Sequence, residues 1–425
     1  MPVSSSGGPS SYVLWVLAPR IPRHRSWRQC AFRVPEAQAI AAALPETLRT
    51  LEGATKGFGE LEAEVIKAGR CTECRACVDL CAADGPEALS LDLGAFRFDA
   101  DKCTACGLCY AVCPEAPWAW DDLQDRYDAQ EGTIGHVSSL SSAITRSAII
   151  KDRSADGGVA SSLLWYLLDT GEIDGAILSR DSGPLGPNMF VARTRDEILA
   201  ATGLRAGRGA SMATNSGVVV NLDTIAHLRR MHKDDPASAE RLAIVGTPCQ
   251  TYTVRRMQQV AVSPTPRIGI VFGLFCYEAL PLNKVQWQRF EEATGLRVGD
   301  VEKLQMREEL VLTMRDGRTE RIDLDTASLL AGPNCLRCSD FSSRFADLSL
   351  GAVGSSPGFT TVVVRTQRGR ALFDGALEAG YVTEWTTLFR EGGREESERK
   401  IRRQLEEQTL KKIELARRHG AQITA

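Results

Sequence analysis

The stretch C-T-E-C-R-A-C-V-D-L-C at residues 71–81 is followed, after 21 intervening residues, by C-T-A-C-G-L-C-Y-A-V-C-P at residues 103–114. Each copy places four cysteines at spacings of two, two and three residues. Bacterial ferredoxins have this spacing, and the fourth cysteine of each of their runs ligates the other cluster of the pair. The doubled run therefore predicts a small α+β, two-[4Fe-4S] ferredoxin-like domain over residues 70–120.

The crossing of the fourth cysteines divides the eight thiols between two clusters. We expect one cluster to be held by Cys71, Cys74, Cys77 and Cys113, and the other by Cys103, Cys106, Cys109 and Cys81. Zinc knuckles are the alternative. They are disfavoured because zinc ribbons usually separate two CxxC pairs by a long insert.

Composition limits the class of protein and its surroundings. The chain is 43% hydrophobic and 25% charged, with a net charge of -3, so it is globular and gives no reason to expect a nucleic-acid partner. Its thirteen cysteines suit metal ligation in a reducing compartment better than disulfides. No apolar run approaches the ~20 residues of a membrane helix. We expect a cytoplasmic protein, with peripheral attachment to a membrane complex and organellar import left open.

The remaining sequence divides into five further segments. Residues 1–35 contain five arginines and no acidic residue; we favour a disordered or non-native extension over a transit peptide. Residues 36–69 predict a helical lead-in, and residues 121–145 a polar linker. From 146 to 385, aliphatic runs alternating with helical segments predict an α/β domain with a mixed, largely parallel sheet. Residues 386–425 predict a charged helix that clamps one surface, with partner binding as the alternative.

Within the α/β domain, strands are expected at 148–151, 174–179, 189–193, 242–245, 268–275 and 359–365. Helices are expected at 159–169, 195–201, 218–232, 282–293 and 370–379. Residues 310–324 predict a hairpin that turns at Asp316-Gly317. The apolar stripe of the C-terminal helix comprises Ile401, Leu405, Leu410 and Ile413.

Four more cysteines lie in the α/β domain. Cys249 and Cys276 each follow a predicted strand, and ligands bind at the carboxyl ends of strands in such sheets. Cys335 and Cys338 form a CxxC pair. Together the four could hold a third [4Fe-4S] cluster. A zinc site, and ordinary buried cysteines beside an isolated CxxC pair, remain open at this point.

A glycine pair lies where a strand is expected to pass into a helix. Asp156-Gly157-Gly158 could bring backbone N–H groups to a phosphate, although a plain helix cap explains the pair equally well. The chain has no G-x-G-x-x-G sequence, so a Rossmann dinucleotide site is not supported.

Six motifs, in order, resemble one known family. They are D-G-G-V-A-S-S-L-L from Asp156, G-T-P-C-Q from Gly246, G-L-F-C from Gly273, N-C-L-R-C-S-D-F from Asn334, A-D-L-S-L-G-A-V-G-S from Ala346 and G-F-T-T-V-V-V-R-T from Gly358. The family is that of the beta subunits of coenzyme F420-reducing hydrogenase, F420-dependent formate dehydrogenase and F420H2 dehydrogenase. The resemblance covers residues 146–385, and relatives carry a two-cluster ferredoxin module ahead of this domain.

The resemblance implies FAD in the α/β domain, with a nearby [4Fe-4S] cluster held by the cysteines that match Cys249, Cys276, Cys335 and Cys338. Asp156, Gly157 and Gly158 become flavin contacts by the same carry-over, and Asn215 and Thr247 become candidates. Relatives often have a Gly-x-Lys-Tyr segment ahead of the asparagine, where this chain has Gly207-Arg208-Gly209-Ala210. The resemblance therefore does not settle which hydride donor this chain uses.

The resemblance and the cysteines together predict an oxidoreductase subunit that passes electrons between coenzyme F420 and a partner protein through FAD and three [4Fe-4S] clusters. The expected partner is a hydrogenase, formate dehydrogenase, heterodisulfide-reductase-type or membrane dehydrogenase complex. Two alternatives stay open: a reductase of another small organic substrate, since the family includes a plant chlorophyll reductase, and a non-catalytic relay with zinc in the second cysteine set.

Overall fold

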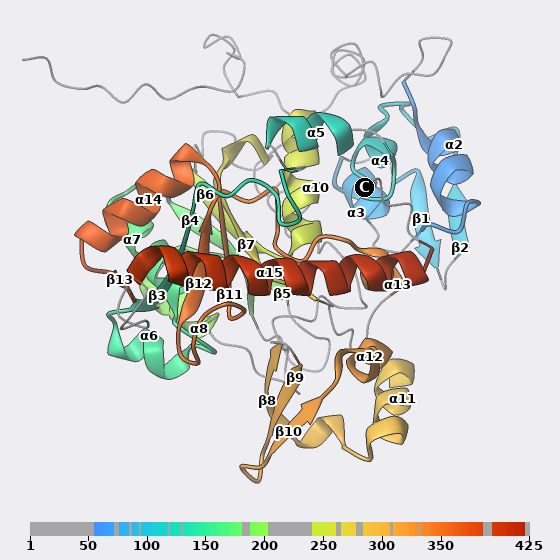
Figure 1. Cartoon of the computed structure of the whole chain (residues 1–425). Helices are drawn as coiled ribbons and strands as arrows, with labels where there is room; N and C mark the ends of the chain where they lie inside the picture. Colours follow the sequence, from blue (N-terminus) through green and yellow to red (C-terminus); the bar gives the residue numbers. More distant parts are fainter. Residues whose placement is uncertain are drawn as a thin grey trace, which may run out of the picture.

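A computed structural model gives the arrangement of the chain (Figure 1). It describes residues 55–71, 76–84, 87–92, 95–117, 120–127, 129, 131–180, 188–202, 240–260, 265–277, 284–306, 309–330, 333–385 and 393–420. The expectations for Cys74, Asn215, the helix at 218–232 and residues 1–54 lie outside these residues.

An eight-stranded mixed sheet forms the centre of the α/β domain, in the order β13-β3-β12-β11-β7-β6-β4-β5. In chain order its strands are β3 (Ser139–Thr145), β4 (Gly175–Arg180), β5 (Asn188–Ala192), β6 (Leu242–Gly246), β7 (Ile268–Leu274), β11 (Leu348–Gly351), β12 (Thr360–Val364) and β13 (Val382–Glu384). Strands β4, β6, β7 and β11 are parallel, and β12 pairs antiparallel with both β11 and β3. The carboxyl ends of these four strands and of β3 therefore meet at one edge.

Helices cover both faces of the sheet because its strands are apolar on both sides. The first face packs against α7 (Val159–Asp169), α8 (Arg195–Ala200) and α14 (Gln367–Glu378). The opposite face packs against α10 (Pro248–Gln259) and, beyond it, the ferredoxin-like module. Helix α15 (Gly393–Arg418) crosses this side of the molecule toward α13 (Pro333–Arg337) (Figure 1).

The ferredoxin-like module consists of short elements around the repeated cysteines. They are α2 (Phe58–Leu61), the π-helix η3 (Glu62–Ile66), α3 (Ala76–Asp84), β1 (Leu89–Asp92), β2 (Ala95–Phe98) and α4 (Leu108–Ala111). β1 and β2 form an antiparallel hairpin. Arg256 of α10, fully buried, donates from Nη1 to the carbonyl of Ala116 at 2.9 Å. The module is thereby fixed against the α/β domain.

A small satellite unit lies at the bottom of Figure 1. It contains α11 (Lys284–Thr294), β8 (Val301–Met306), β9 (Leu310–Met314), β10 (Thr319–Ile322) and α12 (Leu324–Ala327), with 3-10 turns at Val298–Asp300 and Ser328–Leu330. Its strands form an antiparallel sheet in the order β10-β9-β8. The predicted hairpin is confirmed, and Gly317 supplies its left-handed residue with φ +86°.

Two expectations about the start of the α/β domain are wrong. Residues 148–151 belong to helix α6 (Ala148–Arg153), which Ser147 caps by accepting a hydrogen bond from the Ile150 N–H. Ile150 is buried whereas Ile149 is 50% exposed, so this short apolar run has only one inward side chain. The actual strand, β3, lies inside the range expected as a linker, which also contains all but the first residue of α5 (Trp120–Arg126).

The C-terminal helix is confirmed, but part of its expected stripe is wrong. Ile401 and Leu405 are buried, whereas Leu410 is 55% exposed. The buried face continues instead through Gln408, Thr409, Lys412, Leu415 and Ala416.

Candidate redox site

The structure brings Cys81 of the first repeat beside the cysteines of the second. Burial raises the pKa of the Cys81 thiol, and the neighbouring Cys106 and Cys103 thiols raise it further. Burial also raises the pKa of Cys109, with Cys106, Cys103 and Cys81 adding to the effect. Cys81 is therefore a neighbour of the second repeat's cysteines, and the assignment of these four thiols to one cluster stays a prediction.

The second cysteine loop turns through a glycine that no larger residue could replace without strain. Gly107 has φ +74° and begins α4 as its N-cap. A Cβ atom there would lie 2.3 Å from Thr55 Cγ2 and 2.8 Å from the Lys56 carbonyl oxygen. The loop between Cys106 and Cys109 is thus packed tightly against the segment that precedes α2.

The four later cysteines, far apart in sequence, line one cavity of about 170 Å³. Cys249 lies in the first turn of α10, Cys276 follows β7, and Cys335 and Cys338 lie in and just after α13. A cavity needs a volume of only ~10–15 Å³ to hold one water molecule, so this cavity is larger than a water or a single ion requires. Among the described residues, no three His, Cys, Asp or Glu side chains are close enough to hold a single metal ion.

Burial is the largest influence on the pKa of three of the thiols that line this cavity. Burial raises the pKa of Cys249 and of Cys276 well above the ordinary value, and the other cysteines of the set raise both further. Burial also raises the pKa of Cys338. Buried thiols of this kind become thiolate ligands only when a metal centre supplies compensating positive charge.

Lys412 of α15 also lines this cavity, and the sequence analysis did not single it out. It is 1% exposed, its Nζ donates to the Cys335 carbonyl at 2.6 Å, and it lies 5.2 Å from the centre of the Tyr277 ring. The spacing along the helix could have identified it, because Lys412 lies seven residues after the buried Leu405 and therefore on the same helix face.

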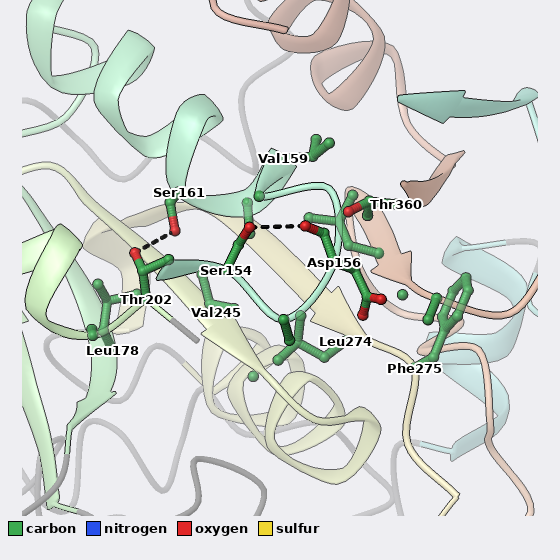
Figure 2. A pocket seen from close by; sticks show the side chains of 18 of the residues that line it. Ser154, Asp156, Val159, Ser161, Leu178, Thr202, Val245, Leu274, Phe275 and Thr360 are labelled. Carbon is green, nitrogen blue, oxygen red and sulfur yellow. Dashed lines mark hydrogen bonds between the residues drawn. The ribbon is translucent and has the colours of Figure 1, made fainter. Parts of the chain in front are cut away.

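A second, larger cavity of about 230 Å³ lies at the carboxyl edge of the main sheet (Figure 2). The ends of β4, β6, β7 and β11, the start of β12 and the amino end of α7 contribute to its wall. Most of the lining is apolar, with a smaller set of polar side chains at Ser154, Asp156, Ser161, Ser179, Thr202, Thr247, Gln250 and Thr360. An apolar cleft with a few polar groups at a strand-end edge is the usual form of a cofactor site.

The Asp156-Gly157-Gly158 turn lies at this cavity. Asp156 and Gly158 line it, and Ser154 Oγ donates to the Asp156 carbonyl at 2.8 Å (Figure 2). Gly158, with φ +69°, is the N-cap of α7. Gly157 instead lies against the sheet, where its carbonyl accepts from the Thr145 N–H at 2.7 Å. The turn is therefore both a helix cap and part of the cavity wall.

Two chain segments connect the two cavities. Thr247 lines the larger cavity, and its Oγ1 is 3.0 Å from Cys249 Sγ. Phe275 also lines the larger cavity, whereas the next residue, Cys276, lines the thiol cavity. The Cys276 N–H donates to the Phe341 carbonyl at 3.0 Å. Only a residue or two of protein therefore separates the walls of the two spaces.

The thiol cavity also adjoins the ferredoxin-like module. Pro114 and Glu115 line it, directly after Cys113 in the chain. Burial raises the pKa of the Cys113 thiol to about 11, against an opposing effect of Arg256. The cavity thus lies between the strand-end pocket and a cysteine of the first expected ferredoxin cluster.

Family profiles match three parts of the chain. Residues 63–114 match a 4Fe-4S dicluster domain. Residues 141–210 and 239–387 match the N-terminal and C-terminal regions of the coenzyme F420 hydrogenase/dehydrogenase beta subunit, and together these two cover just over half of the chain. The chain belongs to this family. The resemblance stated from the sequence motifs is confirmed.

Individual relatives agree with the family. The chain is similar to the coenzyme F420 hydrogenase subunit beta of Methanosarcina barkeri, with 29% identity over 251 residues, 58% of this chain and 80% of the relative. It is 26% identical over 333 residues to the coenzyme F420-dependent sulfite reductase of Methanocaldococcus jannaschii, a match that covers 73% of this chain but only 46% of that protein.

A solved structure shares the fold. The chain aligns with one subunit of the F420-reducing [NiFe] hydrogenase complex from Methanosarcina barkeri, with a TM-score of 0.55 and 25% identity, covering 68% of this chain and 92% of that one. No helix within the described residues is both long and apolar enough to cross a membrane.

Proposed function

We propose that this protein is a flavin- and iron–sulfur-dependent oxidoreductase subunit that exchanges electrons between coenzyme F420 and a partner protein. One observation carries the proposal. The cavity lined by Cys249, Cys276, Cys335 and Cys338 has residues next to Cys113 in one wall and adjoins the strand-end pocket through Thr247 and Phe275. Three sites suited to redox groups therefore follow one another without a gap.

FAD is the group that suits the strand-end pocket. The pocket presents apolar walls for a planar ring system, and the amino ends of α7 and α10 meet at its edge. Helix amino ends favour negatively charged groups, so the pyrophosphate has a place there. Gly158 and Thr247, the N-caps of these two helices, are the proposed contacts, together with Asp156. A bound flavin exchanges two-electron and one-electron equivalents, which iron–sulfur clusters alone do not.

A [4Fe-4S] cluster suits the thiol cavity. It would be held by the four thiols of Cys249, Cys276, Cys335 and Cys338, in a space larger than one ion needs. The same reasoning assigns Cys71, Cys74, Cys77 and Cys113 to one ferredoxin cluster and Cys103, Cys106, Cys109 and Cys81 to the other. The protein sets the order of the sites, because Thr247, Phe275 and Phe341 separate the pocket from the thiols.

A second candidate is a reductase of another small organic substrate on the same scaffold. The Gly207-Arg208-Gly209-Ala210 segment favours it, because it lacks the Lys-Tyr pair that relatives often have there. The partner protein in either case is a redox subunit of a larger complex, by analogy with the hydrogenase beta subunits.

A hydride-donor assay tests the proposal. Protein purified without oxygen is mixed with reduced F420 or NADPH, with a viologen dye as the electron acceptor. We expect dye reduction with reduced F420 and none above background with NADPH. Protein that contains flavin and clusters but reduces the dye only with NADPH would contradict F420 as the donor and leave the electron-transfer role in place.

A further inference from the structure

Lys412 combines burial with an unusual lack of counter-charge. Its side chain reaches the thiol cavity from α15, donates to the Cys335 carbonyl at 2.6 Å and lies beside the Tyr277 ring. Within the described part of the chain, no carboxylate lies within ion-pair distance of its ammonium group. A carbonyl and an aromatic ring compensate only part of the charge of a buried cation.

The other charged groups at the cavity do not supply the missing charge. Asp340 accepts hydrogen bonds from the backbone N–H groups of Ser343 and Arg344, at 2.9 and 3.0 Å. Its carboxylate also lies 3.7 Å from the Arg344 guanidinium. Arg337 adds further positive charge to the cavity wall, and its guanidinium donates to the Arg70 carbonyl at 3.1 Å. Glu115 also lines the cavity, where its carboxyl interacts with the guanidinium groups of Arg337, Arg70 and Arg256. The four thiols are therefore the groups that can become the partner of Lys412.

We propose that Lys412 is the counter-charge of the group held by Cys249, Cys276, Cys335 and Cys338, and that it raises the reduction potential of that group. The inference rests on the third cluster of the proposed function. Four thiolates give such a cluster a net negative charge, and reduction adds one more electron to it. A fixed buried cation stabilises the more negative, reduced form relative to the oxidised form, since cluster potentials depend on net charge and exposure.

Lys412 is a positioning residue in this account, because it acts on the cluster through charge and through the Cys335 carbonyl. The matched control lies next to it. Lys411 is on the same helix and is exposed, so its replacement removes the same charge in solvent, where water and salt screen it.

The test is an anaerobic potentiometric titration of the loaded protein, with dithionite as the one-electron source and electron paramagnetic resonance as the readout. In Lys412→Met we expect the ratio of reduced to oxidised third cluster at a fixed potential to fall at least about tenfold, equivalent to ~59 mV for one electron. The two ferredoxin clusters and Lys411→Met should keep wild-type potentials. An unchanged third-cluster potential in Lys412→Met overturns the inference.

Loss of the third cluster in Lys412→Met is resolved by Lys412→Arg, which keeps the charge. Assembly in Lys412→Arg but not in Lys412→Met supports the counter-charge role, whereas loss in both overturns it in favour of a shape requirement. Wild-type protein that holds only the two ferredoxin clusters would overturn the third-site proposal and this inference together. A third cluster that is present but keeps its potential in Lys412→Met would instead overturn only the inference about Lys412.

Discussion

Gly157→Ala tests how the turn at the strand-end pocket is built. An added Cβ would lie 2.6 Å from the Ala143 carbonyl oxygen and 2.6 Å from the Thr360 backbone nitrogen. Both atoms belong to the sheet, so neither can move aside as a flexible side chain would. Restoring ordinary contact of ~3.4 Å requires the turn to shift by roughly 0.8 Å, away from β3 and β12.

The energetic cost follows from two opposing effects. Overpacking a filled site costs typically ~1–3 kcal/mol. Replacing glycine by alanine returns ~0.4–1 kcal/mol by restricting the unfolded chain. We therefore expect a net loss of about 1–2 kcal/mol, which corresponds to a fall in Tm of roughly 2–8 °C for a domain of this size. Because Asp156 and Gly158 line the pocket, the displaced turn should also lower the FAD content.

Two measurements on the purified protein check this prediction: the thermal unfolding midpoint by circular dichroism, and the ratio of flavin to protein by absorbance. Gly59→Ala is the matched control, because Gly59 is inside a helix and an added Cβ meets no atom within 4 Å. It should leave flavin content unchanged and be neutral or stabilising by up to ~1 kcal/mol. A Gly157→Ala protein with wild-type Tm and full flavin would refute the reasoning.

Three further predictions concern the cysteine groups and the C-terminal helix. Cys249→Ser should remove a third cluster signal from electron paramagnetic resonance spectra and leave both ferredoxin signals; loss of a ferredoxin signal would show that the grouping is wrong. Cys81→Ser should give the same spectrum as Cys103→Ser, because we expect the two neighbouring thiols to hold the same cluster; different spectra would contradict the crossing. Leu405→Ala should cost ~2–5 kcal/mol of unfolding free energy in urea titrations, whereas Leu410→Ala, at a 55% exposed position, should stay within ~0.5 kcal/mol. Equal effects at the two positions would mean that α15 does not pack as described.

The sequence carried the parts of this structure that depend on local spacing. The doubled cysteine run predicted the ferredoxin-like module, and aliphatic runs located β6, β7 and β12 within a residue or two. Strand β3 was not predicted because its sequence, S-L-S-S-A-I-T, consists mostly of small and polar residues. Ser142, Ala143 and Thr145 are nevertheless buried, a property of the packed sheet that no local pattern records.

The sequence identified the four cysteines of the thiol cavity, but it could not show that they lie close together. Cys249 and Cys276 could be placed at strand ends, yet only the folded chain shows that α13 brings Cys335 and Cys338 to the same cavity. Lys412 was missed because a lysine on a charged helix is usually solvated, although its spacing from Leu405 marked it as inward-facing.

The most direct test of the central claim is a count of iron, zinc and FAD in one anaerobic preparation of the full chain. Three [4Fe-4S] clusters and one flavin site require about twelve iron atoms and about one FAD per chain, with no stoichiometric zinc. About eight iron atoms with one zinc, or a preparation without flavin, would contradict the account.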